Sequence, residues 1–422
     1  MQIIEAWMQK KPSSKAVAFW NMMGSLVNAA VSVLLLMMVT RTLGDAEAGV
    51  FSLGFSVSLM MLTVGMFEVR PFQSTDIYKQ FTFASYFTFR ILTCALMLLI
   101  TVGYVLLNGF GGEKAWVVVL LCILKCVEAF SDVFNGQAQQ NDRLDVAGFS
   151  LSVRVFVYCA GFLVSLLLTK NLLISCGVMV VLALLWLVIF DAGTGRYFEK
   201  CRVDFNKKAL FELFKSCFPL FLASFLMMYI NNAPKFAVDA HLSAEYQTYY
   251  GILFMPASVI NLFSLFAFRP LLTKLTAFWN ENQYKPFLTT IAKLLLWILA
   301  VTVVALVGGW LLGIPLLSLL YGTDLTAFKS ELMIVLVGGG FNAVCVLLYY
   351  MITVQRKQKY VLIGYVGAAL AAFLLGDRMV AAYGLLGASL TYLLSVILLC
   401  LLFIGIFTTV LLKKRKGEKQ LG

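Results

Sequence analysis

Residues 49–71 read GVFSLGFSVSLMMLTVGMFEVRP, and residues 251–270 read GILFMPASVINLFSLFAFRP. Each stretch opens with glycine, continues as an apolar run and closes with an arginine-proline pair. Each run is long enough to cross a bilayer as a helix, which needs about 20 residues. A tyrosine-lysine pair follows each closure, at Tyr78-Lys79 and Tyr284-Lys285. Because the second stretch begins past the middle of the 422-residue chain, the repetition predicts two related halves in a membrane.

The composition also indicates a membrane protein. Hydrophobic residues make up 61% of the chain and charged residues 13%, and the mean hydropathy is +0.90. The predicted fold class is an all-α polytopic membrane protein, with twelve transmembrane helices in two pseudo-symmetric six-helix bundles. The twelve apolar segments lie within residues 16–40, 46–67, 81–107, 115–139, 146–169, 171–192, 210–235, 246–268, 285–311, 331–354, 360–378 and 385–411.

The order of these segments predicts three regions. Residues 1–192 form an N-terminal six-helix bundle, residues 193–209 a cytoplasmic linker, and residues 210–422 a C-terminal six-helix bundle with a basic cytoplasmic tail. Most of the 33 lysines and arginines fall on the side shared by both termini, which places the termini in the cytoplasm. The same asymmetry explains the net charge of +12 without a nucleic-acid partner.

Neither a metal ion nor a cofactor is expected. The chain has a single histidine, His241, so it cannot assemble a histidine-based zinc site or a catalytic triad. Its nine cysteines are scattered mostly through apolar segments and are expected to fill space there.

Polar residues recur at helical spacing inside two of the apolar segments. In segment 115–139 the stripe contains five residues that lie on one helical face: Lys125, Glu128, Asp132, Asn135 and Gln139. In segment 16–40 a milder stripe contains Asn21, Ser25, Asn28 and Ser32. Because ionisable groups inside a membrane normally face a bundle interior or a wet cavity, both helices are expected to line an interior.

Three cations are expected near the middle of the bilayer. Counting inward at about 1.5 Å per residue, Arg90, Lys125 and Arg154 reach similar depths in a hydrocarbon core roughly 30 Å thick. With only one or two acids within reach, they predict a cationic chamber that a transported anion neutralises. Arginine suits phosphate oxygens especially well. The alternatives are a structural Lys125–Glu128 pair and arginines that bond carbonyls or extend to the headgroups.

The second half offers fewer deep charges. Lys293 maps near Arg90 after the shared tyrosine-lysine pair, so it is a further candidate for binding the anion. Arg70 and Arg269, which close the two repeated stretches, form either a matched pair at the cytoplasmic mouth or anchors to the headgroups.

The sequence resembles the bacterial Wzx-like polysaccharide-export flippases of the multidrug/oligosaccharidyl-lipid/polysaccharide (MOP) exporter superfamily. The residues that carry the resemblance are Gly24-Ser25, Val39-Thr40-Arg41, Leu43-Gly44, Ala48-Gly49, Gly65, Val69-Arg70-Pro71-Phe72-Gln73, Glu128, Asp132, Gln139-Gln140, Arg143 and Leu144-Asp145. The resemblance implies two six-helix bundles that alternate access in the bacterial cytoplasmic membrane. It also implies a cargo of undecaprenyl-diphosphate-linked oligosaccharide, flipped to the outer leaflet.

The expected function is therefore a non-enzymatic transporter of an anionic lipid-linked oligosaccharide. Its expected surroundings are membrane lipids, with a polysaccharide polymerase or glycosyltransferases as further partners. Drug-exporting relatives usually carry an acidic residue in the first span, whereas this chain has Asn21 and Asn28 there. The alternative in the same superfamily is a cation-coupled drug antiporter that uses Glu128 or Asp132. A membrane enzyme is the remaining alternative, and the short outward loops disfavour it.

Overall fold

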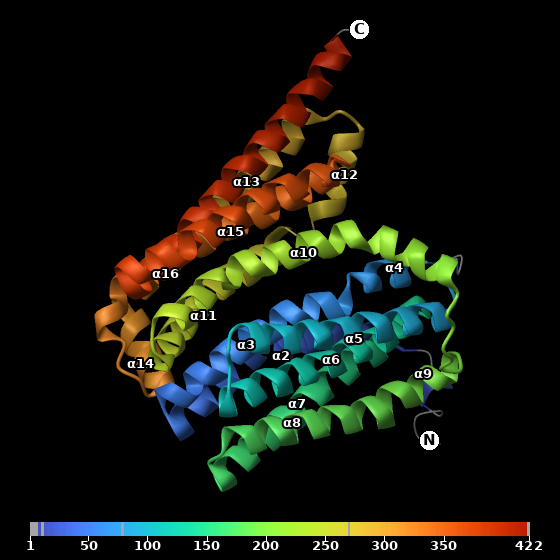
Figure 1. The fold of residues 1–422 in the computed structure, drawn as a ribbon. Helices are drawn as coiled ribbons and strands as arrows, with labels where there is room; N and C mark the ends of the chain where they lie inside the picture. Colours follow the sequence, from blue (N-terminus) through green and yellow to red (C-terminus); the bar gives the residue numbers. More distant parts are fainter. Residues whose placement is uncertain (1–6, 10–11, 77–79, 269–270, 420–422) are drawn as a thin grey trace. The chain divides into compact units, whose positions relative to one another are not determined.

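The computed structural model describes residues 7–9, 12–76, 80–268 and 271–419, and all regular secondary structure in these ranges is helical (Figure 1). Ten helical stretches among the described residues are long and apolar enough to cross a membrane. The predicted all-α polytopic fold is thereby confirmed. The chain groups into two compact units, Met1–Phe225 and Leu226–Gly422.

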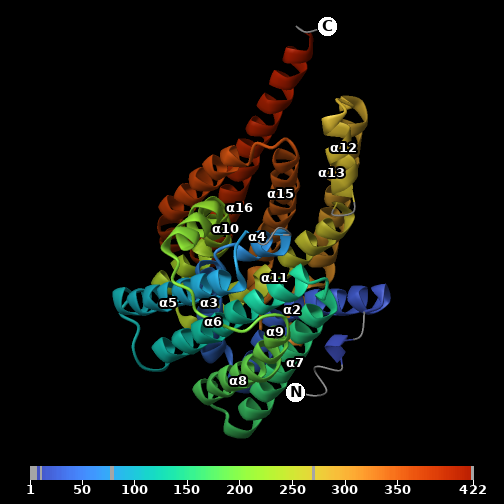
Figure 2. The same cartoon turned by 90° about the vertical axis from the view of Figure 1, so that its right-hand side faces the viewer.

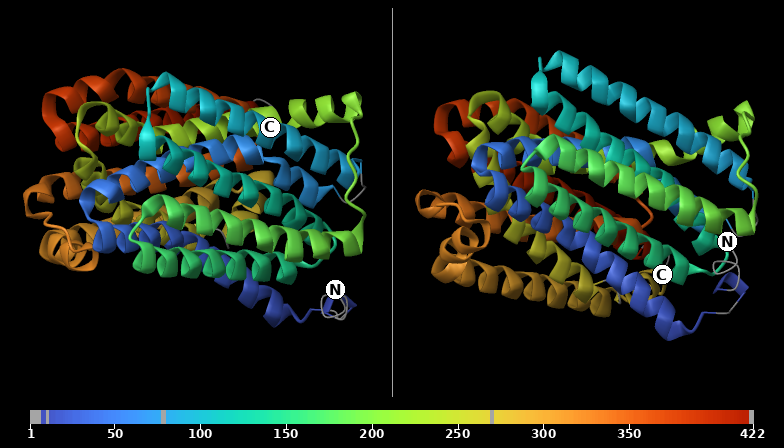
Figure 3. Two further views of the ribbon diagram at one scale, coloured as in Figure 1. Left: turned by 60° about the horizontal axis from the view of Figure 1, so that its bottom comes forward. Right: turned by 90° about the horizontal axis from the view of Figure 1, so that it is seen from below.

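Among the described residues, several helices lie wholly in the first unit, which also includes the start of α10 (Lys207–His241). These complete helices are α2 (Ser14–Leu43), α3 (Asp45–Met66), α4 (Val69–Thr75), α5 (Phe83–Leu107), α6 (Gly112–Gln140), α7 (Leu144–Thr169), α8 (Leu172–Trp186) and α9 (Ala192–Phe198). A π-helical turn, Leu187–Asp191, joins α8 to α9 without a break. Figure 3 shows the long helices of this unit, coloured blue to green, running side by side.

Polar side chains fix where several of these helices begin. The hydroxyl of Ser13 accepts a hydrogen bond from the amide of Ala16 at 3.2 Å, just before α2. Thr82 does the same for Ser85 at 3.2 Å before α5. Each cap satisfies an amide that has no partner within its helix, and such caps contribute about 1 kcal/mol each.

Glycine sets the closest approach in this unit, where α2 packs along α7. A Cβ placed on Gly148 of α7 would lie 2.5 Å from the backbone carbonyl carbon of Trp20 in α2. Since that neighbour is backbone and cannot rotate away, only glycine fits at position 148.

The helix α6 lies at the centre of the first unit, because it packs against α3, α5, α7 and α8. The helix is not one of the ten apolar stretches, since its sequence carries Glu113, Lys114, Lys125, Glu128 and Asp132. The neighbouring helices therefore cover a charged helix on several sides.

The second unit begins within α10 (Lys207–His241). Its further helices are α11 (Ala244–Phe268), α12 (Leu272–Asn280), α13 (Tyr284–Gly308), α14 (Ile314–Tyr321), α15 (Lys329–Val354) and α16 (Gln358–Lys419), and a π-helical turn, Gly309–Gly313, joins α13 to α14. Figure 2 shows α12 and α13 beside each other. In α16 the backbone leaves helical geometry at Gly384, with φ 59° and ψ −136°. This break separates the predicted segments 360–378 and 385–411.

The repeated sequence stretches correspond to a repeated structural pattern. In each unit a long helix, α3 or α11, is followed by a short one, α4 or α12, and then by another long one, α5 or α13. The two short helices lie between the predicted apolar segments, where the sequence analysis predicted no helix. After α3 the chain turns through Phe67 and Glu68, which both have left-handed backbone angles.

The observed boundary between the units lies inside α10, beyond the predicted linker of residues 193–209. The start of α10 packs on the first unit through its aromatic side chains. Phe221 stacks on Phe67 with ring centroids 4.3 Å apart, and the Ser224 hydroxyl donates to Glu68 at 2.6 Å. These contacts explain why the first unit extends to Phe225.

Candidate functional site

The charged stripe of α6 lies in the interior of the first unit. Lys125, Glu128, Asp132 and Asn135 are all buried there. Since neighbouring helices surround α6, ionisable side chains from other helices reach this stripe. The resulting contacts form three separate ionic clusters, and each contains a carboxylate.

The first cluster is centred on Asp132, which binds two guanidinium groups. Nη1 of Arg70 lies 2.9 Å from Oδ1 of Asp132, and Nη2 of Arg90 lies 3.3 Å from Oδ2. Arg70 also donates from Nε to the side-chain oxygen of Gln139 at 3.3 Å. One carboxylate thus compensates two cations, which leaves a net positive charge in this cluster.

The end of α3 positions Arg90. The left-handed turn after Met66 stops the helix, so carbonyl groups in its last turn are free to accept other donors. Arg90 donates from Nη1 to the carbonyl of Gly65, and the Thr93 hydroxyl donates to the same carbonyl at 2.8 Å. The Arg90 side chain is completely buried, and its Nε has no hydrogen-bond partner among the described residues.

The second cluster joins α6 to α7. Nζ of Lys125 lies 2.9 Å from Oε2 of Glu128, and the Tyr158 hydroxyl donates to Oε1 of the same carboxylate at 3.1 Å. The ammonium group also lies 4.9 Å from the centre of the Phe55 ring. The structural Lys125–Glu128 pair that the spacing allows is therefore present.

The third cluster depends on an acid that the sequence analysis did not include. Nη1 of Arg154 lies 3.4 Å from Oδ2 of Asp191. The hydroxyls of Ser131 and Ser150 also donate to Asp191, the first at 2.5 Å, and the indole of Trp186 donates to Ser150 at 3.0 Å. Asp191 lies on the π-helical turn. Its side chain is buried against α6 and α7, which supply its partners.

The expectation that only one or two acids approach the three deep cations is wrong. Arg90, Lys125 and Arg154 each contact a carboxylate, on Asp132, Glu128 and Asp191 respectively. With Arg70 included, four cations face three carboxylates. Within these three clusters the cations exceed the carboxylates by one, in the Asp132 cluster, and Glu68 lies beside that cluster as a further acid.

A pocket of about 460 Å³ opens beside the Asp132 cluster. Arg70 lines it with a side chain that is 34% exposed, and Asp132 and Gln139 lie behind it. Nη2 of Arg70 has no hydrogen-bond partner among the described residues. Glu68 also lines the pocket, and it accepts the hydrogen bond from Ser224. Among the predicted cations, Arg70 combines an ion pair with access to a cavity.

The remaining candidate residues lie elsewhere. Asn21, Ser25 and Asn28 are exposed on α2, in contrast to the buried stripe of α6. Lys293 is exposed on α13 in the second unit. Arg269 lies outside the described residues. The clusters of the first unit therefore contain Arg70, Arg90, Lys125, Arg154, Glu128 and Asp132 from the predicted set, while Asn135 is buried beside them.

The fold is similar to that of solved transporters, although the sequence matches no protein-family model and no curated protein. An inward-facing multidrug resistance MATE family transporter of the MOP superfamily superposes with a TM-score of 0.67 at 12% identity, over 93% of this chain and 96% of that one. The lipid II flippase MurJ, in an inward closed conformation, gives 0.68 at 14% identity, over 93% and 91%.

A third solved structure is a MOP superfamily transporter from Pyrococcus furiosus, for which a binding pocket of reverse polarity is described. It superposes with a TM-score of 0.54 at 12% identity, over 96% of this chain and 98% of that one. Together these similarities show that the chain has the fold of MOP superfamily transporters, as the sequence resemblance implies.

Proposed function

We propose that this chain is a MOP-class transporter that flips an undecaprenyl-diphosphate-linked oligosaccharide from the cytoplasmic to the outer leaflet of the bacterial cytoplasmic membrane. The observation that carries the proposal is the Asp132 cluster beside the 460 Å³ pocket. There Arg70 and Arg90 share one carboxylate, and Arg70 keeps a free Nη2. A planar guanidinium binds phosphate oxygens with two parallel hydrogen bonds, which favours a diphosphate head over a neutral ligand.

The paired state of these cations suggests that cargo binding exchanges ionic partners. A diphosphate entering the pocket takes the Arg70 guanidinium from Asp132, while Arg90 continues to compensate that carboxylate. The exchange leaves no isolated buried charge, which would cost several kcal/mol. Because a ligand shifts only those states that it binds differently, the exchange gives the cargo a means of changing the access of the site.

Other predicted residues have secondary roles in this proposal. Lys125 compensates Glu128, which accepts from Tyr158 of α7, and the Arg154–Asp191 pair joins α7 to the π-helical turn, so these groups hold the helices in position. The exposed amides of Asn21 and Asn28 on α2 are suited to sugar hydroxyls, and Lys293 remains a candidate for contact with the anionic part of the cargo. A polymerase or glycosyltransferases would receive or supply the cargo.

The first long helix supports a lipid-linked cargo over a drug. The sequence of α2 contains no aspartate or glutamate, so it lacks the carboxylate that drug-exporting relatives use for cation coupling. The fold is as similar to a lipid II flippase (TM-score 0.68) as to the MATE transporter (TM-score 0.67). This similarity is consistent with a lipid-linked cargo.

The test is the translocation of lipid-linked glycan in cells that carry Arg70→Gln. We expect export to fall by about tenfold, because one charge-assisted contact to the diphosphate is lost. Arg196→Gln on α9 is the matched control, since it removes the same charge from an exposed position. Normal export by Arg70→Gln at normal protein levels would refute the role of this cluster in cargo binding.

The second candidate function is a cation-coupled antiporter for drugs or metabolites. The buried carboxylates of Glu128, Asp132 and Asp191 favour it, because such groups are able to exchange a cation. Drug efflux driven by an imposed proton or sodium gradient, abolished by Glu128→Gln or Asp132→Asn, would select this function over the flippase.

A further inference from the structure

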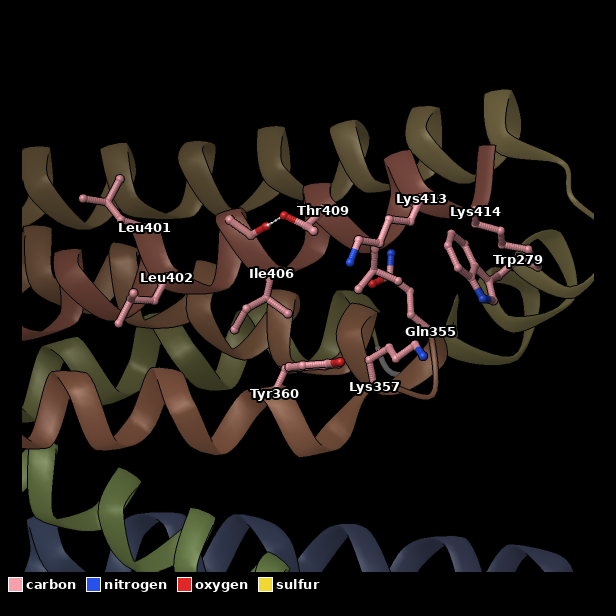
Figure 4. A pocket seen from close by; sticks show the side chains of 12 residues that line it. Trp279, Gln355, Lys357, Tyr360, Leu401, Leu402, Ile406, Thr409, Lys413 and Lys414 are labelled. Carbon is pink, nitrogen blue, oxygen red and sulfur yellow. Dashed lines mark hydrogen bonds between the residues drawn. The ribbon is translucent and has the colours of Figure 1, made fainter. Parts of the chain in front are cut away.

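The second unit contains a larger pocket than the one beside Arg70. Its volume is about 780 Å³, and its walls come from α12, from the connection between α15 and α16, and from the first turn and the second half of α16 (Figure 4). All its lining residues belong to the second unit, so the pocket is separate from the clusters around α6. No predicted site residue lines it.

One end of this pocket is cationic. Lys357, Lys413 and Lys414 line it, and none of the lining residues is acidic. Lys414 is already engaged, since its Nζ donates to the carbonyl of Trp279 at 2.7 Å and lies 4.4 Å from the centre of that indole ring. The side chains of Lys357 and Lys413 are exposed, and their ammonium groups form no ion pair or hydrogen bond with other described residues. The pocket therefore presents two available ammonium groups on a wall that Lys414 and Trp279 stabilise.

A buried amide lies at the same end. Gln355 is only 4% exposed, and neither its Oε1 nor its Nε2 has a hydrogen-bond partner among the described residues. Figure 4 shows this amide close to the Lys413 side chain. Leaving a buried polar group without a partner costs about 1–3 kcal/mol. A ligand that both accepts from Nε2 and donates to Oε1 would satisfy this amide.

The other end of the pocket is apolar. Leu401, Leu402 and Ile406 line it, and Figure 4 places the two leucines far from the lysines along α16. Leu401 is 61% exposed and lies in a helical stretch that is apolar enough to cross a membrane. An occupant of this end is therefore a hydrocarbon chain that enters from the bilayer.

We propose that this pocket binds an anionic phospholipid with a hydroxyl-bearing headgroup, as in phosphatidylglycerol. Lys357 and Lys413 hold the phosphate, Gln355 exchanges hydrogen bonds with the phosphate and the glycerol hydroxyl, and an acyl chain lies along Leu401 and Ile406. Basic pockets between membrane helices are typical binding sites for anionic headgroups. A polyprenyl phosphate would also fit the lysines and the apolar wall, but its phosphate has little to donate to Oε1 of Gln355.

The experiment measures lipid retained by the purified full-length protein in detergent, by native mass spectrometry. The probes are phosphatidylglycerol and phosphatidylcholine with identical acyl chains, and undecaprenyl phosphate. We expect preferential retention of phosphatidylglycerol, and a loss of about fivefold for each of Lys357→Gln and Lys413→Gln. Gln355→Leu is expected to weaken retention without any change in charge.

The double variant Lys359→Gln, Lys285→Gln is the matched control, because both lysines are exposed and neither lines the pocket. Equal retention of the two phospholipids by the unaltered protein would overturn the proposal, and this comparison requires no variant. An equal loss in the control double variant would also overturn it, since binding would then reflect general surface charge. Preferential retention of undecaprenyl phosphate would assign the pocket to the cargo lipid instead.

Discussion

Arg154 and Asp191 face each other at 3.4 Å, with side chains that are 2% and 1% exposed. The pair joins α7 to the π-helical turn that follows α8. Two serine hydroxyls also donate to Asp191, so the carboxylate accepts three contacts from two helices. A buried pair of this kind is costly to break from one side, because the remaining charge has no solvent to compensate it.

Replacing one member of this pair is expected to destabilise the protein. Asp191→Asn leaves the Arg154 charge uncompensated, and we expect a loss of about 3–5 kcal/mol in unfolding free energy. The measurement is denaturant unfolding of the purified protein in detergent. The double variant Arg154→Leu, Asp191→Leu should recover part of this loss, because it removes both charges. Asp191→Asn with the stability of the unaltered protein would contradict the importance of the pair.

The close approach of α2 and α7 gives a second prediction. Gly148→Ala places a methyl group against the backbone of Trp20 and should cost about 1–3 kcal/mol through forced displacement of the helices. Gly177→Ala is the control, since a Cβ at Gly177 meets nothing within 4 Å. That control should be neutral or stabilising by up to about 1 kcal/mol. Thermal unfolding of both variants checks this, and equal effects would be inconsistent with a tight α2–α7 contact.

Loss of the shared carboxylate in the Asp132 cluster should separate cargo binding from transport. In Asp132→Asn, Arg70 and Arg90 lose their common partner, so we expect tighter binding of a diphosphate by about tenfold. Translocation should nevertheless fall, because no carboxylate remains to reclaim Arg70 and release the cargo. Undecaprenyl diphosphate binding to purified protein and glycan export in cells are the two measurements.

The exposed Asp142→Asn is the control for this variant, because position 142 has a left-handed backbone angle that asparagine tolerates. It should change neither binding nor export. Weaker diphosphate binding by Asp132→Asn would mean that the guanidiniums do not contact the head of the cargo.

The break in α16 makes a prediction about membrane sidedness. If residues 360–378 and 385–411 cross separately, Gly384 and the C-terminus lie on opposite sides of the membrane. The charge asymmetry predicts a cytoplasmic C-terminus and therefore an external Gly384. Alkaline phosphatase inserted after Gly384 should thus be active, whereas the same enzyme fused after Gly422 should be inactive. Activity at the C-terminus would reverse the proposed orientation.

Much of the fold is predictable from the sequence because apolar length is a strong signal in membrane proteins. Each of the twelve predicted segments falls, to within two residues at its ends, inside a helix or a continuous run of helical turns. The short helices α4 and α12 were not predicted, since their sequences are brief and not continuously apolar. The boundary at Phe225 was also not predictable, because it depends on aromatic packing of Phe221 on Phe67 and not on composition.

The candidate site was only partly predictable. Helical spacing was sufficient to indicate the Lys125–Glu128 pair, because residues three apart are neighbours on any helix. The Arg70–Asp132 and Arg90–Asp132 contacts join different helices, and their partners depend on tertiary packing. Asp191 was missed because it ends an apolar segment, where an acid normally faces water. A signal was present in Ser131, Ser150 and Trp186, which place hydrogen-bonding groups on α6, α7 and α8.

The π-helical turn from Leu187 to Asp191 changes which face the residues of α9 present to the neighbouring helices. One extra residue in a turn rotates the downstream helix by about 100° about its axis relative to a regular α-helix. Asp191 consequently meets Arg154, and Gly195 meets the ring of Phe134, where a Cβ would lie 2.5 Å from a ring carbon. Deleting a single residue from this turn would thus turn α9 away from α6 as one body, and the buried acid and the glycine contact would disappear together.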